Sequence, residues 1–336
     1  METMKRLVLK MGMLAAAVLL SQCALTVGLL HVAGGRLQNQ LLRFDMYARL
    51  QHHLKLKTDI HYFGDCTLFT GKAGDKDNRS IPAMLQALCP GYAVAELSHP
   101  AYHMDLYLAF CQYIVKQGQH PKLVIIPINM RSFSPEWDRR PQYQFTREKT
   151  ILAGGPKKYL LLAFDRLFMS LGYDLCAGSR DKYLREPVYC GDEKVGLVKD
   201  FLNPDFGKYS DEIMRDKLVF FYLYSLRPGH RKVRSLLEIA RVLSLHSIPV
   251  IFYVMPIDCQ TGEEFFPGLF SRRLAENVRV IRSALAETGN DVMDFSAAVP
   301  RGEFAWRQYP SEHIDSQGKL RVAEGLSSRL NGLLKR

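Results

Sequence analysis

The sequence predicts an α/β fold of three layers, in which a parallel sheet of five strands lies between two layers of helices. Short apolar runs alternate along the chain with longer segments of helical periodicity. Two of these runs, 123–128 (LVIIPI) and 249–255 (PVIFYVM), are continuously apolar, which is typical of parallel strands buried on both faces. A chain of 336 residues is long enough to bury such a core.

Five strands and four helices are expected over 58–336. Pro100 precedes the first helix and Gly289 follows the third, which fits the preference for proline at helix starts and glycine at helix ends. The expected strands are 59–63, 92–97, 123–128, 249–255 and 291–295, and the expected helices are 101–116, 230–246, 269–288 and 316–334.

The stretch 131–226 interrupts this alternation. It is rich in Tyr, Phe, Arg and Asp and has no run that resembles a buried strand. We expect a mostly helical insertion that forms a lid or a partner surface, because insertions of this kind emerge near the carboxyl ends of strands, where α/β proteins bind ligands. Its aromatic residues suit a glycan surface or a packed helical subdomain, and include Trp137, Tyr143, Phe145 and Tyr159.

The amino-terminal stretch 11–33 carries no acidic, lysine or arginine side chain and follows a short basic tail, 1–10. About 20 apolar residues cross a bilayer, whereas the apolar part of a secretory signal has about 7–15. We therefore expect a transmembrane anchor, with a cleaved signal as the alternative. Residues 34–57 then form a helical stalk, and 58–336 form the main domain. This predicts a single-pass protein of the inner (cytoplasmic) membrane with its carboxyl-terminal domain outside the cytoplasm.

The net charge of +11 comes from 45 Lys and Arg against 34 Asp and Glu, spread along the chain without a basic block. No nucleic-acid motif accompanies it, so the expected partners are a membrane or an anionic envelope polymer and not nucleic acid. No cysteine or histidine pattern has metal-ligand spacing, and no cofactor is predicted. Seven cysteines leave at least one unpaired within the chain. Cys176 and Cys190 are either a disulfide or two thiols.

Three polar segments follow predicted strands or precede the last helix. Asp65 and Cys66 come after the first strand, Asn129 after the third, and His313 before the closing helix. Carboxyl ends of parallel strands meet at one edge of a sheet, so we expect these side chains to converge. No metal ion is expected at this site.

A thiol at a strand-to-helix turn lies near free backbone N–H groups, which favour a thiolate with a pKa below about 8.5. His313 can take the thiol proton. The Asn129 amide and the backbone N–H of Ala101 can donate hydrogen bonds to an oxyanion. The set predicts acyl transfer, with Cys66 and His313 as the reacting pair.

Each of these residues has another interpretation. Cys66 can be a small buried apolar residue, and Asn129 can close a strand end by bonding its own backbone. Asp65 is expected to stabilise its turn. Other histidines near strand ends that could replace His313 as the base are His61, His99 and His103.

The blocks Gly64-Asp65-Cys66, Asn129 and His313-Ile-Asp-Ser-Gln-Gly resemble those of the SGNH/GDSL hydrolase family, in the family's order, from about residue 57 onward. The resemblance implies a flavodoxin-like α/β/α fold and a nucleophile at Cys66, where the family usually has serine. It also implies oxyanion donors at Asn129 and Ala101 and a base at His313.

The sequence departs from that family's pattern at three positions. Cys66 replaces serine, the glycine that usually follows the second strand is either replaced by Ala101 or absent, and Pro310 stands where an acidic residue usually precedes the histidine by three positions. Another acid would have to orient His313. The candidates are Glu312, Asp258 and Asp294.

The order of anchor, stalk and outer domain resembles one branch of the family, the envelope-polymer acylation proteins. These include the D-alanyl transfer protein of teichoic-acid modification and the alginate acetylation proteins. The resemblance implies an acyltransferase or esterase that acts on O-acyl groups of an envelope polysaccharide beside a membrane-bound O-acyltransferase. The alternatives are a catalytically decayed binding or accessory module and, third, a thiol redox protein, which the absence of a C-x-x-C pair disfavours.

Overall fold

The computed structural model describes residues 2–41, 44–155, 157–159, 161–162, 184–190, 192–201, 210–305 and 312–334. The chain folds as two compact units. The first comprises Met1–Arg49 and Thr146–Leu175, and the second comprises Leu50–Phe145 and Cys176–Arg336.

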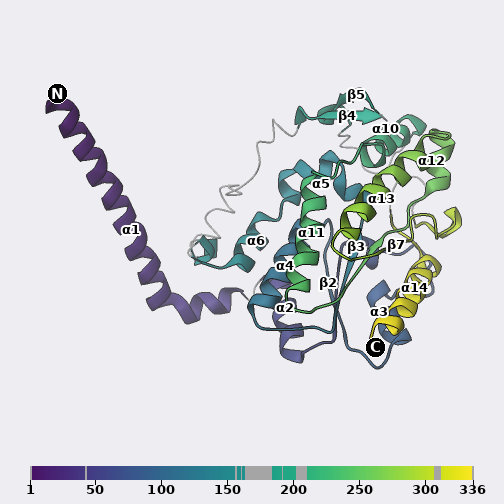
Figure 1. Cartoon of the computed structure of the whole chain (residues 1–336), viewed down its shortest axis with the longest axis horizontal. Coiled ribbons are helices and arrows are strands. Elements are labelled where there is room, and N and C mark those ends of the chain that lie inside the picture. Colours follow the sequence, from purple (N-terminus) through teal and green to yellow (C-terminus); the bar gives the residue numbers. More distant parts are fainter. Residues whose placement is uncertain are drawn as a thin grey trace. The chain divides into compact units, whose positions relative to one another are not determined.

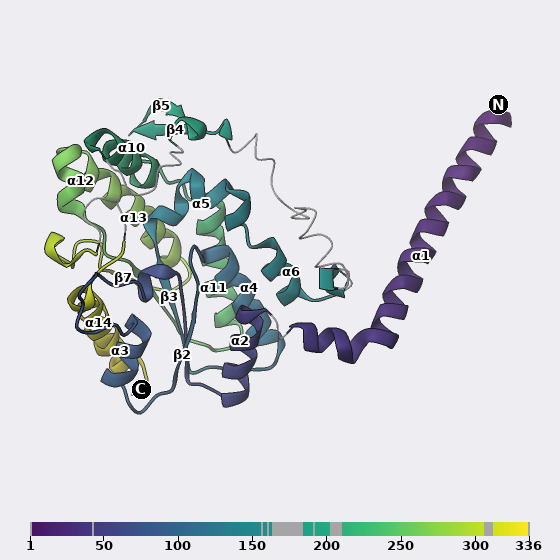
Figure 2. The same cartoon turned by 180° about the vertical axis from the view of Figure 1, so that it is seen from behind.

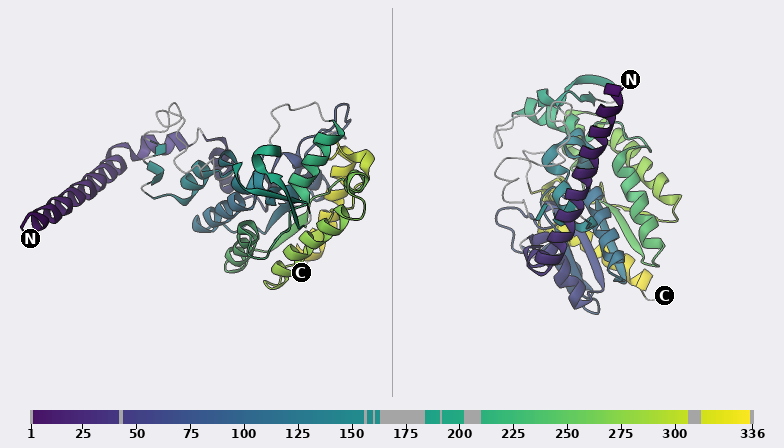
Figure 3. Two further views of the ribbon diagram at one scale, coloured as in Figure 1. Left: turned by 90° about the horizontal axis from the view of Figure 1, so that it is seen from above. Right: turned by 90° about the vertical axis from the view of Figure 1, so that its left-hand side faces the viewer.

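The first unit contains helix α1 (Glu2–Leu41), drawn in purple in Figure 3, and helix α6 (Thr146–Ala153). Helix α2 (Asp45–Leu56) leads from this unit into the second. In the described part of the chain, no helix combines the length and the hydrophobicity needed to span a membrane. The anchor at 11–33 stays a prediction.

The second unit is built on a five-stranded sheet. Its strands are β1 (Ile60–Gly64), β2 (Val94–Ser98), β3 (Leu123–Ile128), β6 (Val250–Val254) and β7 (Val292–Asp294). All neighbouring strands are parallel, and their order across the sheet is β2-β1-β3-β6-β7. Counted along the chain this order is 2-1-3-4-5, as in flavodoxin-like folds. The prediction of a five-stranded parallel α/β fold is confirmed.

Helices cover both faces of this sheet (Figures 1 and 2). Helices α3 (Ile81–Leu88) and α14 (Ser316–Leu334) pack together on one face, over a core that includes Ile60 and Tyr62 of β1. Helices α4 (Met104–Lys116), α11 (Arg231–Ser244) and α13 (Phe270–Ala286) cover the other. Phe63, which alternates with Tyr62, packs its ring against Tyr107 and Phe110 of α4.

Helix α4 begins three residues later than predicted. His103 caps it by accepting a hydrogen bond from the N–H of Asp105 at 3.3 Å. Ala101 lies in the preceding turn with a φ of 64°, which is incompatible with a helix start at that residue. The sequence reasoning also missed α3, although Ser80 accepts a hydrogen bond from Ala83 N as its N-cap and Pro82 lies in its first turn.

The described part of the insertion is mostly helical, as predicted, but it also contains an antiparallel hairpin. Strands β4 (Pro187–Cys190) and β5 (Glu193–Leu197) form their own two-stranded sheet. These strands are short and mainly exposed, so they lack the apolar signal of a buried strand. The other elements are η2 (Met130–Phe133), α5 (Pro135–Arg139), η3 (Pro141–Tyr143), α6, α9 (Val198–Phe201) and α10 (Asp211–Tyr222). Cys176 lies outside the described residues, so its pairing with Cys190 stays a prediction.

Candidate active site

The turn after β1 places Cys66 at the carboxyl edge of the sheet. Asp65 is the N-cap of a 3-10 helix, η1 (Cys66–Leu68), and its Oδ1 accepts hydrogen bonds from Thr67 N at 2.9 Å and Thr67 Oγ1 at 2.6 Å. Gly64 has no room for a side chain, because a Cβ there would lie 2.0 Å from Leu68 Cδ1. The close approach of Leu68 and the Asp65 cap together fix the turn that carries Cys66.

The structure brings Cys66 and His313 together. His313 Nε2 lies 3.2 Å from Cys66 Sγ, and His313 is 3% exposed. The segment that carries His313 is held by an antiparallel bridge between Phe304 and Ile314 and by a hydrogen bond from Ala305 N to His313 O at 2.9 Å. A thiol and an imidazole at this separation are within reach of direct proton transfer.

Two backbone N–H groups act on the Cys66 sulfur. They belong to Ala101 and to Cys66 itself, and both lower the pKa of the thiol. Ala101 has the left-handed backbone conformation that glycine adopts most readily, with a φ of 64°. The Ala101 N–H therefore contacts the Cys66 sulfur from a backbone conformation that alanine rarely adopts.

Asn129 is 3% exposed and lies next to Asp65. Its amide donates a hydrogen bond to the Asp65 carboxylate, which lowers the pKa of that acid against the larger, opposite effect of burial. Asn129 Oδ1 has no hydrogen-bond partner among the described residues. An amide group has two N–H donors, so Asn129 can hold Asp65 and still donate to an oxyanion.

The prediction of a low thiol pKa is wrong. Burial raises the pKa of Cys66 to about 12, with a further increase from Asp65, and the opposing effects of Arg131 and the two N–H groups are smaller. Burial, followed by Arg131, lowers the pKa of His313 to about 3. The turn is more buried than the sequence suggested, and a 3-10 helix of three residues contributes little dipole. Thiol and imidazole are therefore both neutral near pH 7.

Arg131 is a site residue that sequence reasoning missed. It is 3% exposed, and its guanidinium lies 4.5 Å from the Trp137 ring and 5.7 Å from the Phe221 ring. Its Nε lies 3.8 Å from Glu312 Oε2, and its charge acts on Cys66 and His313. The available signal was an arginine three residues after a buried strand, between Met130 and Phe133.

Glu312 is fully buried, and its Oε1 accepts a hydrogen bond from Arg131 N at 2.9 Å. The other two candidate orienting acids serve local turns. Asp258 accepts a hydrogen bond from Thr261 N at 2.9 Å as the N-cap of α12 (Cys259–Phe265), and Asp294 accepts one from Ser296 N at 3.0 Å. Pro310 lies outside the described residues.

The three competing histidines have other contacts. His61 Nε2 lies 3.1 Å from Thr58 Oγ1 within the core, and His103 Nε2 lies 2.5 Å from the Tyr143 carbonyl oxygen. His99 is exposed, with Nδ1 3.1 Å from the Pro100 carbonyl oxygen. Of the four histidines considered, His313 is the one that contacts the Cys66 sulfur in the described part of the chain.

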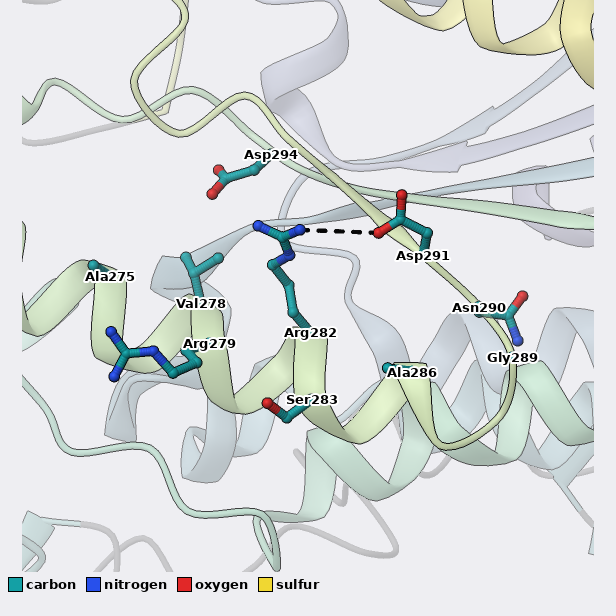
Figure 4. Close-up of a pocket in the computed structure, with 10 residues that line it drawn as sticks. All are labelled: Ala275, Val278, Arg279, Arg282, Ser283, Ala286, Gly289, Asn290, Asp291 and Asp294. Carbon is teal, nitrogen blue, oxygen red and sulfur yellow. Dashed lines mark ion pairs between the residues drawn. The ribbon is translucent and has the colours of Figure 1, made fainter.

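Two cavities lie elsewhere on this unit. A groove of about 710 Å³ runs between α13 and the end of β7, where Arg282 and Asp291 form an ion pair at 4.0 Å (Figure 4). A second cavity, of about 560 Å³, borders η2, and its lining includes Phe133 and Tyr224. Tyr224 donates a hydrogen bond to the Met130 carbonyl oxygen at 2.5 Å. Neither Cys66 nor His313 lines either cavity.

No group of three potential metal-ligating side chains occurs within the described ranges. No protein-family model matches the sequence, and neither does any curated protein.

Several solved structures resemble this chain. A carbohydrate acetylesterase family member from Sinorhizobium meliloti has 10% sequence identity and a TM-score of 0.40, over 82% of this chain and 99% of that one. A lipase/acylhydrolase from Enterococcus faecalis has 11% identity and a TM-score of 0.38, over 81% and 95%. An inhibitor-bound aryl esterase from M. smegmatis has 12% identity and a TM-score of 0.35, over 82% and 98%. The names of these three proteins describe esterases or acylhydrolases.

Proposed function

We propose that this protein is an SGNH-type esterase or acyltransferase in which Cys66 is the nucleophile and His313 is the base. The observation that carries the proposal is the contact of 3.2 Å between Cys66 Sγ and His313 Nε2 at the carboxyl edge of the sheet. The N–H groups of Ala101 and Cys66, which act on the same sulfur, support it because they are placed to stabilise an oxyanion.

The reaction begins from a neutral thiol and a neutral imidazole. As Cys66 sulfur attacks the carbonyl carbon of an O-acyl ester, His313 Nε2 takes the thiol proton and the carbonyl oxygen becomes an oxyanion. Collapse of this intermediate breaks the C–O bond, and His313 returns its proton to the departing alkoxide. The product is a thioester on Cys66. Water or a sugar hydroxyl then attacks the thioester, His313 takes its proton, and the thiol is restored.

The neutral pair makes proton transfer part of the attack. A thiol with a pKa of about 12 and an imidazole with a pKa of about 3 do not form a thiolate–imidazolium pair in the resting protein. Proton transfer therefore accompanies bond formation, as it does for a serine nucleophile. Negative charge forms on the substrate oxygen, where the backbone donors lower its free energy.

The substrate and the location are proposed from the sequence. The uncharged stretch 11–33 would anchor the protein in the cytoplasmic membrane, with the domain facing an envelope polysaccharide and a membrane-bound O-acyltransferase. The net charge of +11 suits an anionic polymer or membrane surface. Amino-terminal sequencing of the mature protein should find the original start, and a start near Gly35 would show that the stretch is a cleaved signal.

The second candidate function is a binding or accessory module that has lost catalysis. The high pKa of Cys66 and the low pKa of His313 favour it, because they describe an unreactive thiol and a weak base. This alternative predicts that Cys66→Ala protein supports polymer acylation in cells as well as wild type does.

The deciding experiment uses the full-length protein with acetylated glycan and with an activated aryl acetate. Mass spectrometry should find an acyl group on the peptide that contains Cys66. Cys66→Ala and His313→Ala should each lower kcat/KM by at least about 10³-fold, the order of loss seen when a reacting residue is removed. Cys111→Ala, which removes a buried thiol of α4, is the matched control and should retain activity. Full activity of Cys66→Ala protein would exclude the proposed mechanism.

A further inference from the structure

Two anchors hold the segment that carries His313. On its carboxyl side, the bridge between Phe304 and Ile314 ties it to the neighbouring loop. On its amino side, Glu312 is bound by Arg131 of η2, through the Arg131 main-chain N–H at 2.9 Å and the guanidinium Nε at 3.8 Å. His313 lies between these anchors, and its Nε2 points at Cys66.

Arg131 is itself held in a stack of side chains. Its guanidinium lies 4.5 Å from the Trp137 ring, which stacks on the Tyr143 ring at 5.0 Å. The guanidinium of Arg140 lies 5.2 Å from the other ring of this pair, that of Tyr143. Cation–aromatic contacts of this kind gain strength when water is excluded. The start of the insertion therefore fixes the Arg131 guanidinium in one place.

We propose that Arg131 is a positioning residue. It binds the Glu312 carboxylate and thereby holds His313 Nε2 against the Cys66 sulfur. This inference rests on the proposed function, in which His313 is the base. The Glu312 carboxylate accepts a hydrogen bond from the Arg131 main-chain N–H and forms an ion pair with the Arg131 guanidinium. Because Glu312 directly precedes His313, these contacts also fix the backbone that carries His313. This role explains why a buried arginine and a fully buried glutamate meet beside the reacting pair.

The ion pair between Arg131 and Glu312 depends on the ionisation of Glu312. Burial raises the pKa of Glu312 to about 7, against the opposing effect of Arg131 and of the N–H groups of Arg131 and Met130. The other charged or titratable groups that interact with it are Asp65, which raises this pKa, and Tyr224. Below about pH 7 the carboxyl is protonated and its ionic contact with Arg131 is lost.

This gives a distinctive pH dependence. Cys66 and His313 titrate near 12 and 3, far from neutrality. A fall in kcat as the pH drops through about 7 is therefore expected from Glu312. Glu312→Gln keeps the shape of the side chain and an oxygen acceptor but removes the titration. It should lower kcat at pH 8 and flatten the limb near pH 7.

The kinetic test compares variants of Arg131 in the full-length protein. Arg131→Met and Glu312→Gln should lower kcat by about 10- to 100-fold, with a smaller change in KM, because misplacement of a reacting group by about 1 Å costs about 10²-fold. Both Arg131→Met and Arg131→Lys keep the main-chain N–H. Arg131→Lys also keeps the positive charge and should therefore recover part of the loss. Arg215→Met is the matched control, because it removes an arginine that lies 4.5 Å from another ring, Phe266, and should leave kcat unchanged.

A measurement that needs no activity separates this proposal from the proposed function. Arg131 lowers the pKa of His313, so Arg131→Met should raise that pKa in an NMR titration of the His313 ring, while Arg215→Met should not. A crystal structure of Glu312→Gln should show Nε2 displaced from Sγ. If Cys66→Ala protein is inactive but Arg131→Met and Glu312→Gln retain full kcat and an undisplaced His313 Nε2, the mechanism stands and the positioning role is refuted. If wild type shows no acyl chemistry, the position of His313 Nε2 relative to Cys66 Sγ in these two variants still decides the role of Arg131.

Discussion

At Cys66, burial outweighs every group that would stabilise a thiolate. Two N–H groups and the Arg131 cation lower the thiol pKa, yet it rises to about 12 because the sulfur is desolvated and the Asp65 carboxylate lies beside it. The same burial keeps His313 neutral. Cys66 is half-buried, and its neutral thiol is protected from alkylation and oxidation because both reactions need a thiolate. In the proposed reaction, the negative charge that the backbone donors stabilise therefore develops only as the sulfur attacks a bound ester.

Asp65→Asn tests this account of the thiol. Asparagine is as good an N-cap as aspartate, so the turn should persist, but the negative charge that raises the thiol pKa is removed. The thiol pKa should fall, and the rate of iodoacetamide labelling of the Cys66 peptide at pH 8 should rise. Mass spectrometry measures this rate. An unchanged rate in folded protein would show that Asp65 does not control the thiol.

Among the helices, α4 and α11 carry a buried polar network that supports the loop after β3. Lys232 of α11 is fully buried and donates a hydrogen bond to the Ser132 carbonyl oxygen of η2. Asp105 of α4 accepts a hydrogen bond from Ser235 at 2.6 Å and pairs with Arg231 at 2.7 Å. The helix pair thus fixes η2, the short helix that contains Arg131 and follows Asn129.

Lys232→Met should destabilise the protein. Methionine fills similar space but leaves the Ser132 carbonyl oxygen buried without this donor, and removes a positive charge that lowers the pKa of Asp138 against the effect of burial. We expect a loss of about 1–3 kcal/mol in the free energy of unfolding, measured by urea denaturation. Arg234→Met, on the exposed face of the same helix, is the control and should change stability by less than about 0.5 kcal/mol. Equal effects of the two variants would contradict a role for the buried network.

For the sheet-containing unit as a whole, buried histidines set the response to acid. Burial lowers the pKa of His61 to about 4 and that of His313 to about 3, and it also lowers the pKa of His103. These folded-state values lie below 6.5, so the unfolded chain binds more protons between them and 6.5. Their contribution to stability is complete above pH 6.5 and is lost as the pH falls. Glu312 acts in the opposite direction, because its pKa is raised, and offsets part of this loss between about pH 7 and 4.5.

We expect the free energy of unfolding to be lower at pH 5 than at pH 7. Each buried histidine should account for about 2 kcal/mol of the difference, because one pKa unit corresponds to about 1.36 kcal/mol. His61→Gln should reduce the difference by that amount, as measured by urea denaturation at both pH values. His246→Gln changes an exposed histidine and is the control. A wild-type stability that does not change between pH 7 and 5 would refute this assignment.

The sequence by itself determined the sheet and the meeting of its chemical groups. The run 123–128 is the strand β3 with the predicted bounds, because six consecutive apolar residues between polar neighbours have few other ways to be buried. Helix α14 likewise has the predicted bounds, Ser316–Leu334. Cys66 and His313 are 247 residues apart in the chain, yet their meeting followed from topology, since parallel strands end at one edge.

Only the tertiary structure decided how that site works. The hydrogen bond between Arg131 and Glu312 joins residues 181 positions apart in the chain. Neither residue lies in a sequence pattern that reveals its partner. The neutrality of Cys66 depends on how completely its surroundings exclude water, which no local sequence feature records. The turn at Ala101 is set by its place between β2 and α4, and against the residue's own preference. Periodicity determines which face of an element is buried, whereas pKa values and ion pairs depend on which distant groups share that burial.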